Sequence, residues 1–229
     1  MKSPSRQLTL ELPLEPSFGR EDFLVSPSNA AAFETFERWP DWPGGGVMLL
    51  LGPTGSGKSH LGTIWAERAG APVLPARELA RTPDVPGLAE AGALLIEDAD
   101  RLGGSGEAEF FHLLNLMRER GGWLAITARA WPDAWGIATR DLLSRLRLAP
   151  AVEIGEPDDV LVRAVLVKLF MDRQLAVDAA VIEFLALRIE RSLAAARSIV
   201  EVLDQEALAA GRAVTRPMAS EVLRRLDLA

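Results

Sequence analysis

One short run of residues constrains this chain more than any other feature. Residues 52–59 read Gly-Pro-Thr-Gly-Ser-Gly-Lys-Ser and directly follow the apolar segment 47–51. The three glycines of such a run allow backbone N–H groups to curl around phosphate oxygens at the start of a helix. A chance glycine-rich turn is the alternative, but a full motif between an apolar strand and a helix favours a phosphate-binding loop. The sequence therefore predicts a strand–loop–helix unit that binds a nucleotide.

The side chains of this loop have different expected roles. Lys58 would reach the β- and γ-phosphates, and Ser59 would ligate Mg²⁺. His60 is next on the helix, and we place it with the cofactor-binding residues, with packing or capping as its alternative role. The predicted cofactor-binding set in this segment is Gly52, Pro53, Thr54, Gly55, Ser56, Gly57, Lys58, Ser59 and His60.

Apolar segments alternate with helical patterns through the first two thirds of the chain. Continuous apolar strands are expected at 47–51, 73–74, 93–96, 123–127 and 152–154. Helices are expected at 29–39, with Ser28 as the cap, from the P-loop to 68, and at 107–120. Strands that are apolar throughout and alternate with helices predict an α/β fold, with a parallel sheet covered by helices on both faces.

After residue 155 only helical patterns remain. We expect helices at 158–173, 179–190, 193–210 and 217–227, with Asp178, Ser192 and Thr215 as caps and Gly211 as a stop. The predicted organisation is a flexible tail at 1–17, a nucleotide-binding domain at 18–155 and a small all-helical lid domain at 156–229.

Polar residues end two of the apolar strands. Glu97 and Asp98 follow the strand at 93–96; one carboxylate of such a pair holds the Mg²⁺ shell and the other orients a water. We assign Glu97 to the metal and Asp98 to catalysis, with two solvated carboxylates as the alternative. The longer side chain at the metal position predicts inefficient hydrolysis. Thr127, at the end of the strand at 123–127, could contact the γ-phosphate or the water that attacks it. A hydroxyl with a purely structural role at the strand end is an equal alternative.

Two arginines are candidates for contacts with nucleotide. Arg145 precedes the last strand, where such a residue often projects toward the nucleotide of a neighbouring subunit; Arg140 and Arg147 are expected to be solvated. Arg191, in front of the long helix at 193–210, could reach phosphates from the lid, and a surface ion pair is the alternative. We assign Arg145 to catalysis and Arg191 to cofactor binding.

The N-terminal segment Gln7-Leu-Thr-Leu-Glu-Leu12 alternates leucines between prolines. Such alternation is typical of an edge strand. In a proline-flanked tail without an obvious partner strand, it favours a docking peptide.

Composition excludes several classes of function. The chain has no cysteine, so disulfides and thiolate chemistry are excluded, and two histidines cannot build a His-rich metal site. The net charge of −7 argues against tight direct binding to DNA. We find no signal peptide and no apolar run long enough to span a bilayer, so a cytoplasmic location without membrane attachment is expected.

The order of these motifs resembles the AAA+ core of the DnaA family of bacterial replication initiators. The resemblance is carried by Phe18–Asn29, Gly52–Ser59, Leu94–Asp98, Leu124–Thr127, Asp141–Leu146 and Arg191. The initiator's N-terminal interaction domain and C-terminal DNA-binding domain have no counterpart here, which makes the chain similar to the DnaA-related regulators that inactivate the initiator. The tail residues Gln7, Leu8, Leu10 and Leu12 are similar to that group's motif for the polymerase sliding clamp.

The resemblance implies a function. ADP or ATP with Mg²⁺ would occupy the P-loop, the tail would dock on the clamp, and Arg145 would act as an arginine finger on ATP bound by DnaA. The protein would contact DNA only through the clamp. A homo-oligomer is possible. The rivals are an autonomous AAA+ ATPase, such as a helicase loader or clamp-loader-like subunit, and a small-molecule P-loop kinase.

Overall fold

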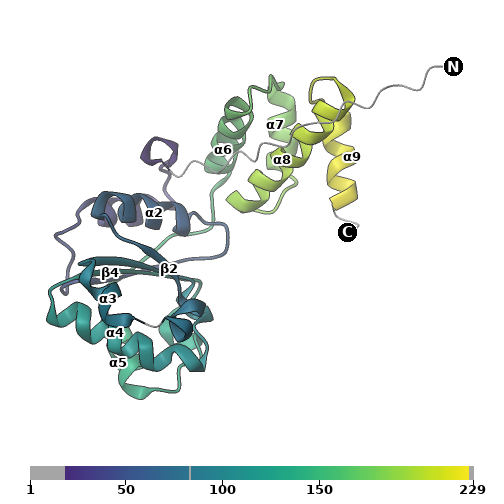
Figure 1. Ribbon diagram of the computed structural model, residues 1–229. Helices are drawn as coiled ribbons and strands as arrows, with labels where there is room; N and C mark the ends of the chain where they lie inside the picture. Colours follow the sequence, from purple (N-terminus) through teal and green to yellow (C-terminus); the bar gives the residue numbers. More distant parts are fainter. Residues whose placement is uncertain (1–18, 83, 227–229) are drawn as a thin grey trace. The chain divides into compact units, whose positions relative to one another are not determined.

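The chain folds into two compact units that meet in sequence between Pro157 and Asp158. The computed structural model describes residues 19–82 and 84–226 (Figure 1). Across these described ranges, no helix is long and apolar enough to cross a membrane.

The first unit is built on a five-stranded parallel sheet. Its strands are β1 (Val47–Leu51), β2 (Val73–Pro75), β3 (Ala93–Glu97), β4 (Trp123–Ala128) and β5 (Ala151–Glu153). They lie in the order β2-β3-β4-β1-β5, and each strand runs parallel to its neighbours. In such a sheet the carboxyl ends of all strands meet at one edge, so the residues that follow β1, β3 and β4 come together there.

Helices cover both faces of this sheet, as the sequence predicts (Figure 1). One face carries α1 (Ala30–Glu37) and α2 (Lys58–Ala69); the other carries α3 (Val85–Glu90), α4 (Glu107–Glu119) and α5 (Arg140–Leu148). Alternate side chains of β1 point to the two layers, since Met48 and Leu50 pack under α1 and α2 while Leu49 and Leu51 pack under α3–α5. Short 3₁₀ turns complete the unit at Arg20–Asp22, Ala76–Arg81, Ala99–Arg101, Gly104–Gly106 and Pro132–Ala134.

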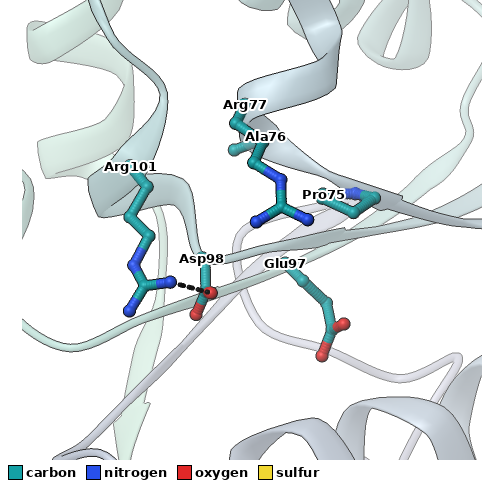
Figure 2. A pocket seen from close by; sticks show the side chains of 6 residues that line it. All are labelled: Pro75, Ala76, Arg77, Glu97, Asp98 and Arg101. Carbon is teal, nitrogen blue, oxygen red and sulfur yellow. Dashed lines mark ion pairs between the residues drawn. The ribbon is translucent and has the colours of Figure 1, made fainter.

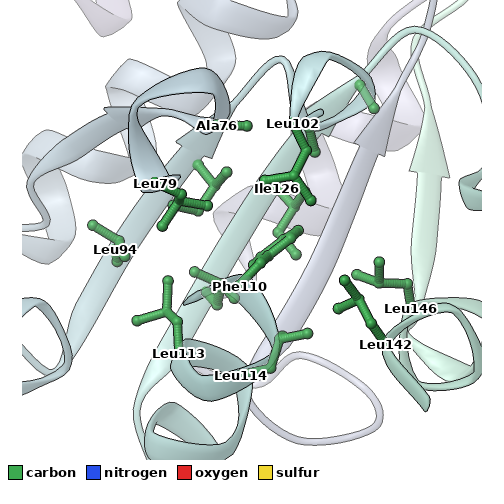
Figure 3. Packing of buried hydrophobic residues seen from close by; sticks show 14 of the residues in the cluster. Ala76, Leu79, Leu94, Leu102, Phe110, Leu113, Leu114, Ile126, Leu142 and Leu146 are labelled. Atoms are coloured by element: carbon green, nitrogen blue, oxygen red, sulfur yellow. The ribbon is translucent and has the colours of Figure 1, made fainter. Parts of the chain in front are cut away.

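The α4–α5 layer is tightly packed against the sheet. Phe110, Leu113 and Leu114 of α4 belong to the same buried cluster as Leu142 and Leu146 of α5 (Figure 3). The spacing of Leu142 and Leu146 places them on one side of α5, which leaves Arg145 at the margin of the contact with α4.

Two local features differ from the sequence prediction. Asn29, not Ser28, is the N-cap residue of α1. The Asn29 Oδ1 accepts the Ser26 N–H at 2.8 Å and its amide donates to the Leu24 carbonyl at 2.9 Å, so this side chain closes the turn before the helix. The helices α3 and α5 are also absent from the sequence prediction, because both are short and α3 begins with a Val-Pro-Gly run.

The second unit is all helical, which confirms the predicted lid. It contains α6 (Asp159–Asp172), α7 (Ala179–Ala186), α8 (Leu193–Ala210) and α9 (Arg216–Leu226), packed around an apolar core of its own. Asp178 and Ser192 cap α7 and α8 through bonds to the N–H groups of Ala180 and Ala195. Gly211 ends α8 with a left-handed conformation, φ 59°.

Candidate functional site

The P-loop joins β1 to α2 at the carboxyl edge of the sheet. The Gly52 N–H donates to the Ala128 carbonyl at 3.2 Å, which holds the loop against the end of β4. A Cβ at Gly52 would lie 2.3 Å from the Ile154 carbonyl oxygen, so no larger residue fits there without displacement of the backbone. Gly57 precedes α2 with φ 104° and offers no side-chain cap. The first N–H groups of α2 therefore have no capping side chain as acceptor. They can donate hydrogen bonds to a bound anion such as a phosphate.

Lys58 is buried inside this loop. Its side chain donates to the carbonyls of Gly52 and Pro53, both at 2.7 Å, and the residue is only 7% exposed. Burial lowers the pKa of the Lys58 ammonium, and the charges of Asp98, Asp100 and Glu97 oppose this shift while that of Arg129 adds to it. The ammonium is thus a desolvated cation placed at the bend where phosphates would bind.

The register of the sheet brings the strand-end residues together. Ile96 pairs with Ile126, so Glu97, the last residue of β3, lies level with Thr127, the penultimate residue of β4. The Asp98 N–H donates to the Thr127 hydroxyl oxygen at 3.0 Å, and Thr127 is 1% exposed. The hydroxyl therefore has a structural partner but still has its own proton to donate. β4 runs one residue beyond the predicted end, to Ala128.

A Mg²⁺ ion would find suitable oxygens at this edge. The Glu97 Oε1 atom is buried and has no hydrogen-bond partner within the described ranges, and the buried Ser56 Oγ is in the same condition. Ser59, the second residue of α2, is exposed. Carboxylate and hydroxyl oxygens suit Mg²⁺, which commonly takes one or two protein ligands together with substrate phosphates. The oxygen atoms of Glu97, Ser56 and Ser59 therefore suit the predicted Mg²⁺ ion.

One charged pair at this edge was missed by sequence reasoning. Both oxygens of Asp100 bind Arg129, through the backbone N–H at 3.1 Å and the Nε atom at 2.5 Å. This contact ties the turn after β3 to the residue that follows β4. The acidic run from Glu97 to Asp100 is a signal in the sequence, but it does not identify the partner, which lies 29 residues further on.

His60 faces the N-terminal segment of the unit. Its Nε2 lies 3.1 Å from the Gly19 carbonyl oxygen, and its ring meets the edge of the Phe23 ring with centroids 5.2 Å apart. Phe23 stacks in turn on Phe33 of α1, with centroids 5.4 Å apart. The start of α2 thus lies against residues 19–23.

Arg145 lies in the layer opposite α2. Its guanidinium binds the Asn115 side-chain oxygen and lies 4.7 Å from the centre of the Phe111 ring, both on α4. Among the described residues no carboxylate forms an ion pair with Arg145, and this includes Asp141 on the same helix. Arg147, two residues further along α5, forms an exposed ion pair with Asp133.

Arg191 and the tail are the remaining predicted site segments. Arg191, which precedes α8 of the lid, forms an ion pair with Asp159, with Nη2 and Oδ1 2.9 Å apart. A surface ion pair is the alternative role that the sequence analysis gives for this arginine. Its role at a nucleotide stays a prediction. The tail residues Gln7, Leu8, Leu10 and Leu12 lie outside the described residues.

Several solved structures are similar to this fold. Domain III of the replication initiation protein DnaA from Thermotoga maritima matches with a TM-score of 0.79 and 19% identity, over 93% of this chain and 98% of that one. AMPPCP-bound DnaA from Aquifex aeolicus matches with a TM-score of 0.70 and 20% identity, over 84% of this chain and 67% of that one. The Thermotoga maritima RuvB Holliday junction branch migration motor matches with a TM-score of 0.61 and 15% identity, over 79% of this chain and 62% of that one.

The chain has the fold of DnaA domain III, with a P-loop between β1 and α2. Residues 159–223 match the family described as "Hda, lid domain". No curated protein matches the chain by sequence. The chain therefore has a DnaA-like fold, and its C-terminal helices match the lid domain of the Hda family.

Proposed function

We propose that this protein is a nucleotide-bound negative regulator of replication initiation. In this proposal an adenine nucleotide and Mg²⁺ occupy the P-loop, the tail docks on the polymerase sliding clamp, and Arg145 completes the site of ATP bound by DnaA. The Hda-type lid, the DnaA-like fold and the AMPPCP carried by the Aquifex relative support this assignment.

The position of Arg145 carries the proposal. Lys58 stands at the start of α2 on one face of the sheet, while Arg145 stands on α5 in the layer on the other face. Its guanidinium rests on an amide and an aromatic ring rather than on a carboxylate. A half-buried cation held in this way keeps its charge available for a phosphate that another molecule brings.

The chemistry expected of Arg145 is electrostatic. In hydrolysis a water oxygen attacks the γ-phosphorus, the bond to the β,γ-bridging oxygen breaks, and negative charge spreads over the transferred group. A planar guanidinium that binds these oxygens stabilises that charge, and an arginine supplied by a partner is worth about 10³–10⁵ in rate. The proposed protein would accelerate turnover by DnaA without hydrolysing its own nucleotide efficiently.

An autonomous AAA+ ATPase is the second candidate, because the P-loop and the Glu97–Asp98 pair are both in place. Two assays of phosphate release separate the two functions. The regulator should show low turnover alone and should stimulate ATP-bound DnaA when clamp loaded on DNA is present. High turnover without DnaA, together with no stimulation of DnaA, would favour the autonomous enzyme.

A further inference from the structure

A small hollow of about 130 Å³ lies at the carboxyl ends of the neighbouring strands β2 and β3. Its walls come from the end of β2, the end of β3 and the turns that follow them, and it is lined by Pro75, Ala76, Arg77, Glu97, Asp98 and Arg101 (Figure 2). Two carboxylates and two guanidinium groups therefore share one concave surface at the place where hydrolysis would be catalysed.

The two carboxylates differ in their surroundings. The Asp98 Oδ2 lies 3.4 Å from the Arg101 Nη1, the ion pair drawn in Figure 2. Glu97 has no ion-pair partner within the described ranges, and one of its oxygens has no hydrogen bond there. Glu97, which we assign to the metal, thus keeps an oxygen that can ligate it. Asp98, which we assign to the attacking water, has its Oδ2 paired with the Arg101 guanidinium.

The backbone conformation of Asp98 favours its ion pair with Arg101. Asp98 has a left-handed conformation, φ 53°, which is uncommon for a residue with a side chain. Its N–H is held by Thr127, and its carbonyl accepts the Arg101 N–H at 2.8 Å. Because Arg101 is three residues further along the same 3₁₀ turn, the turn itself brings the guanidinium back to the carboxylate.

We propose that Arg101 is a positioning residue that withholds Asp98 from the chain's own hydrolysis. To orient a water for attack, and to accept its proton as the oxygen bonds to phosphorus and ADP leaves, a carboxylate must direct an oxygen at that water. The ion pair of Oδ2 with Arg101 holds the Asp98 carboxylate toward the cation instead, while Glu97 can still hold Mg²⁺. This inference deepens and rests on the proposed function, in which the chain retains nucleotide rather than turning it over.

The test measures phosphate release by the protein alone, without DnaA or clamp. Asp98 and Arg101 are about half exposed, so the pair is an exposed one and the expected rise in kcat for Arg101→Ala is about two- to fivefold. KM should stay within about twofold, and Arg101→Lys should keep the low turnover. Arg77→Ala is the matched control, because Arg77 points to the same hollow without an ion pair to either carboxylate (Figure 2).

Two further measurements make the inference falsifiable. The double variant Asp98→Asn, Arg101→Ala should lose the rise in kcat. A double-mutant cycle on thermal unfolding without nucleotide should show coupling between Asp98 and Arg101. Unchanged kcat in Arg101→Ala, an equal rise in Arg77→Ala, or additive effects in the cycle would each overturn it. If that happens while wild-type protein still stimulates DnaA, the inference fails and the proposed function stands; loss of wild-type stimulation would refute the proposed function instead.

Discussion

At Lys58 burial and charge act on the ammonium in opposite directions. Burial is the larger effect and lowers the pKa below its ordinary 10.5, although three carboxylates at the strand ends raise it. A bound phosphate would add negative charge next to the ammonium and stabilise its protonated form. Nucleotide binding should therefore raise the pKa of Lys58.

This gives a pH dependence with a definite sign. Between the lowered pKa of the free protein and the higher pKa of the complex, binding takes up a proton, so the affinity for ADP should fall as pH rises through the free-protein value. Calorimetry from neutral pH to about pH 10, in buffers with different ionisation heats, measures both affinity and proton uptake. Lys58→Ala should abolish binding and the thermal stabilisation by ADP. Wild-type affinity in Lys58→Ala, or proton uptake that does not change with pH, would contradict this role.

Single residues were predictable where a motif fixes their role. Gly52–Ser59 is recognisable because backbone geometry demands glycines at set intervals, and Glu97 is recognisable because a carboxylate follows an apolar strand. The partners of these residues were not predictable. Arg129 on Asp100 and Asn115 on Arg145 are contacts across about 30 residues, which no local pattern encodes.

At the scale of elements, the position of α5 depends on one side chain of α4. Glu107 is 5% exposed, and its carboxylate accepts the N–H groups of Ala138 and Thr139 at 3.0 and 2.8 Å. These N–H groups stand at the start of α5, where the helix has no other side-chain cap. Hydrogen bonds from Thr139 and Ala138 hold the pKa of Glu107 below its ordinary 4.5. Glu107 thus fastens the helix that carries Arg145.

Glu107→Gln should lower the free energy of unfolding by about 1–3 kcal/mol at pH 7, because it weakens bonds to a buried acceptor. Since the folded-state pKa is lowered, the stabilisation by the carboxylate is present above about pH 4.5 and is lost as pH falls through the folded value. Urea unfolding at pH 7 and at lower pH measures both. Exposed Glu119 on the same helix provides the control, and Glu119→Gln should change stability by less than about 0.5 kcal/mol. Equal effects of the two substitutions would contradict the capping role.

Most elements were predictable because their signals are strong. The strands are buried on both faces and read as continuous apolar runs, and the lid helices carry Asp178, Ser192 and Gly211 at their ends. The short helix α5 was missed because only Leu142 and Leu146 face the core, so its apolar pattern is brief. Its contact with α4, which places Arg145, is a tertiary effect.

For the whole molecule, the proposed activity needs attachment to the clamp as well as a nucleotide. Replacement of Gln7, Leu10 and Leu12 together with alanine should abolish clamp binding and leave thermal unfolding unchanged, since the segment is predicted to lie outside the core. A pull-down with the clamp measures binding. Replacement of the intervening Thr9 and Glu11 is the matched control and should retain it. Wild-type clamp binding by the triple variant would place the docking peptide elsewhere, and a loss of thermal stability would show that the segment is a structural strand.

The central claim is that Arg145 acts on nucleotide held by another molecule. The direct measurement is phosphate release by ATP-bound DnaA, with DNA-loaded clamp and each variant added. Arg145→Ala should keep nucleotide and clamp binding but reduce DnaA turnover to the unstimulated rate. Arg145→Lys should rescue poorly, because an ammonium lacks the planar fork of guanidinium. Arg147→Ala on the same helix should stimulate like wild type. Full stimulation by Arg145→Ala would contradict the account.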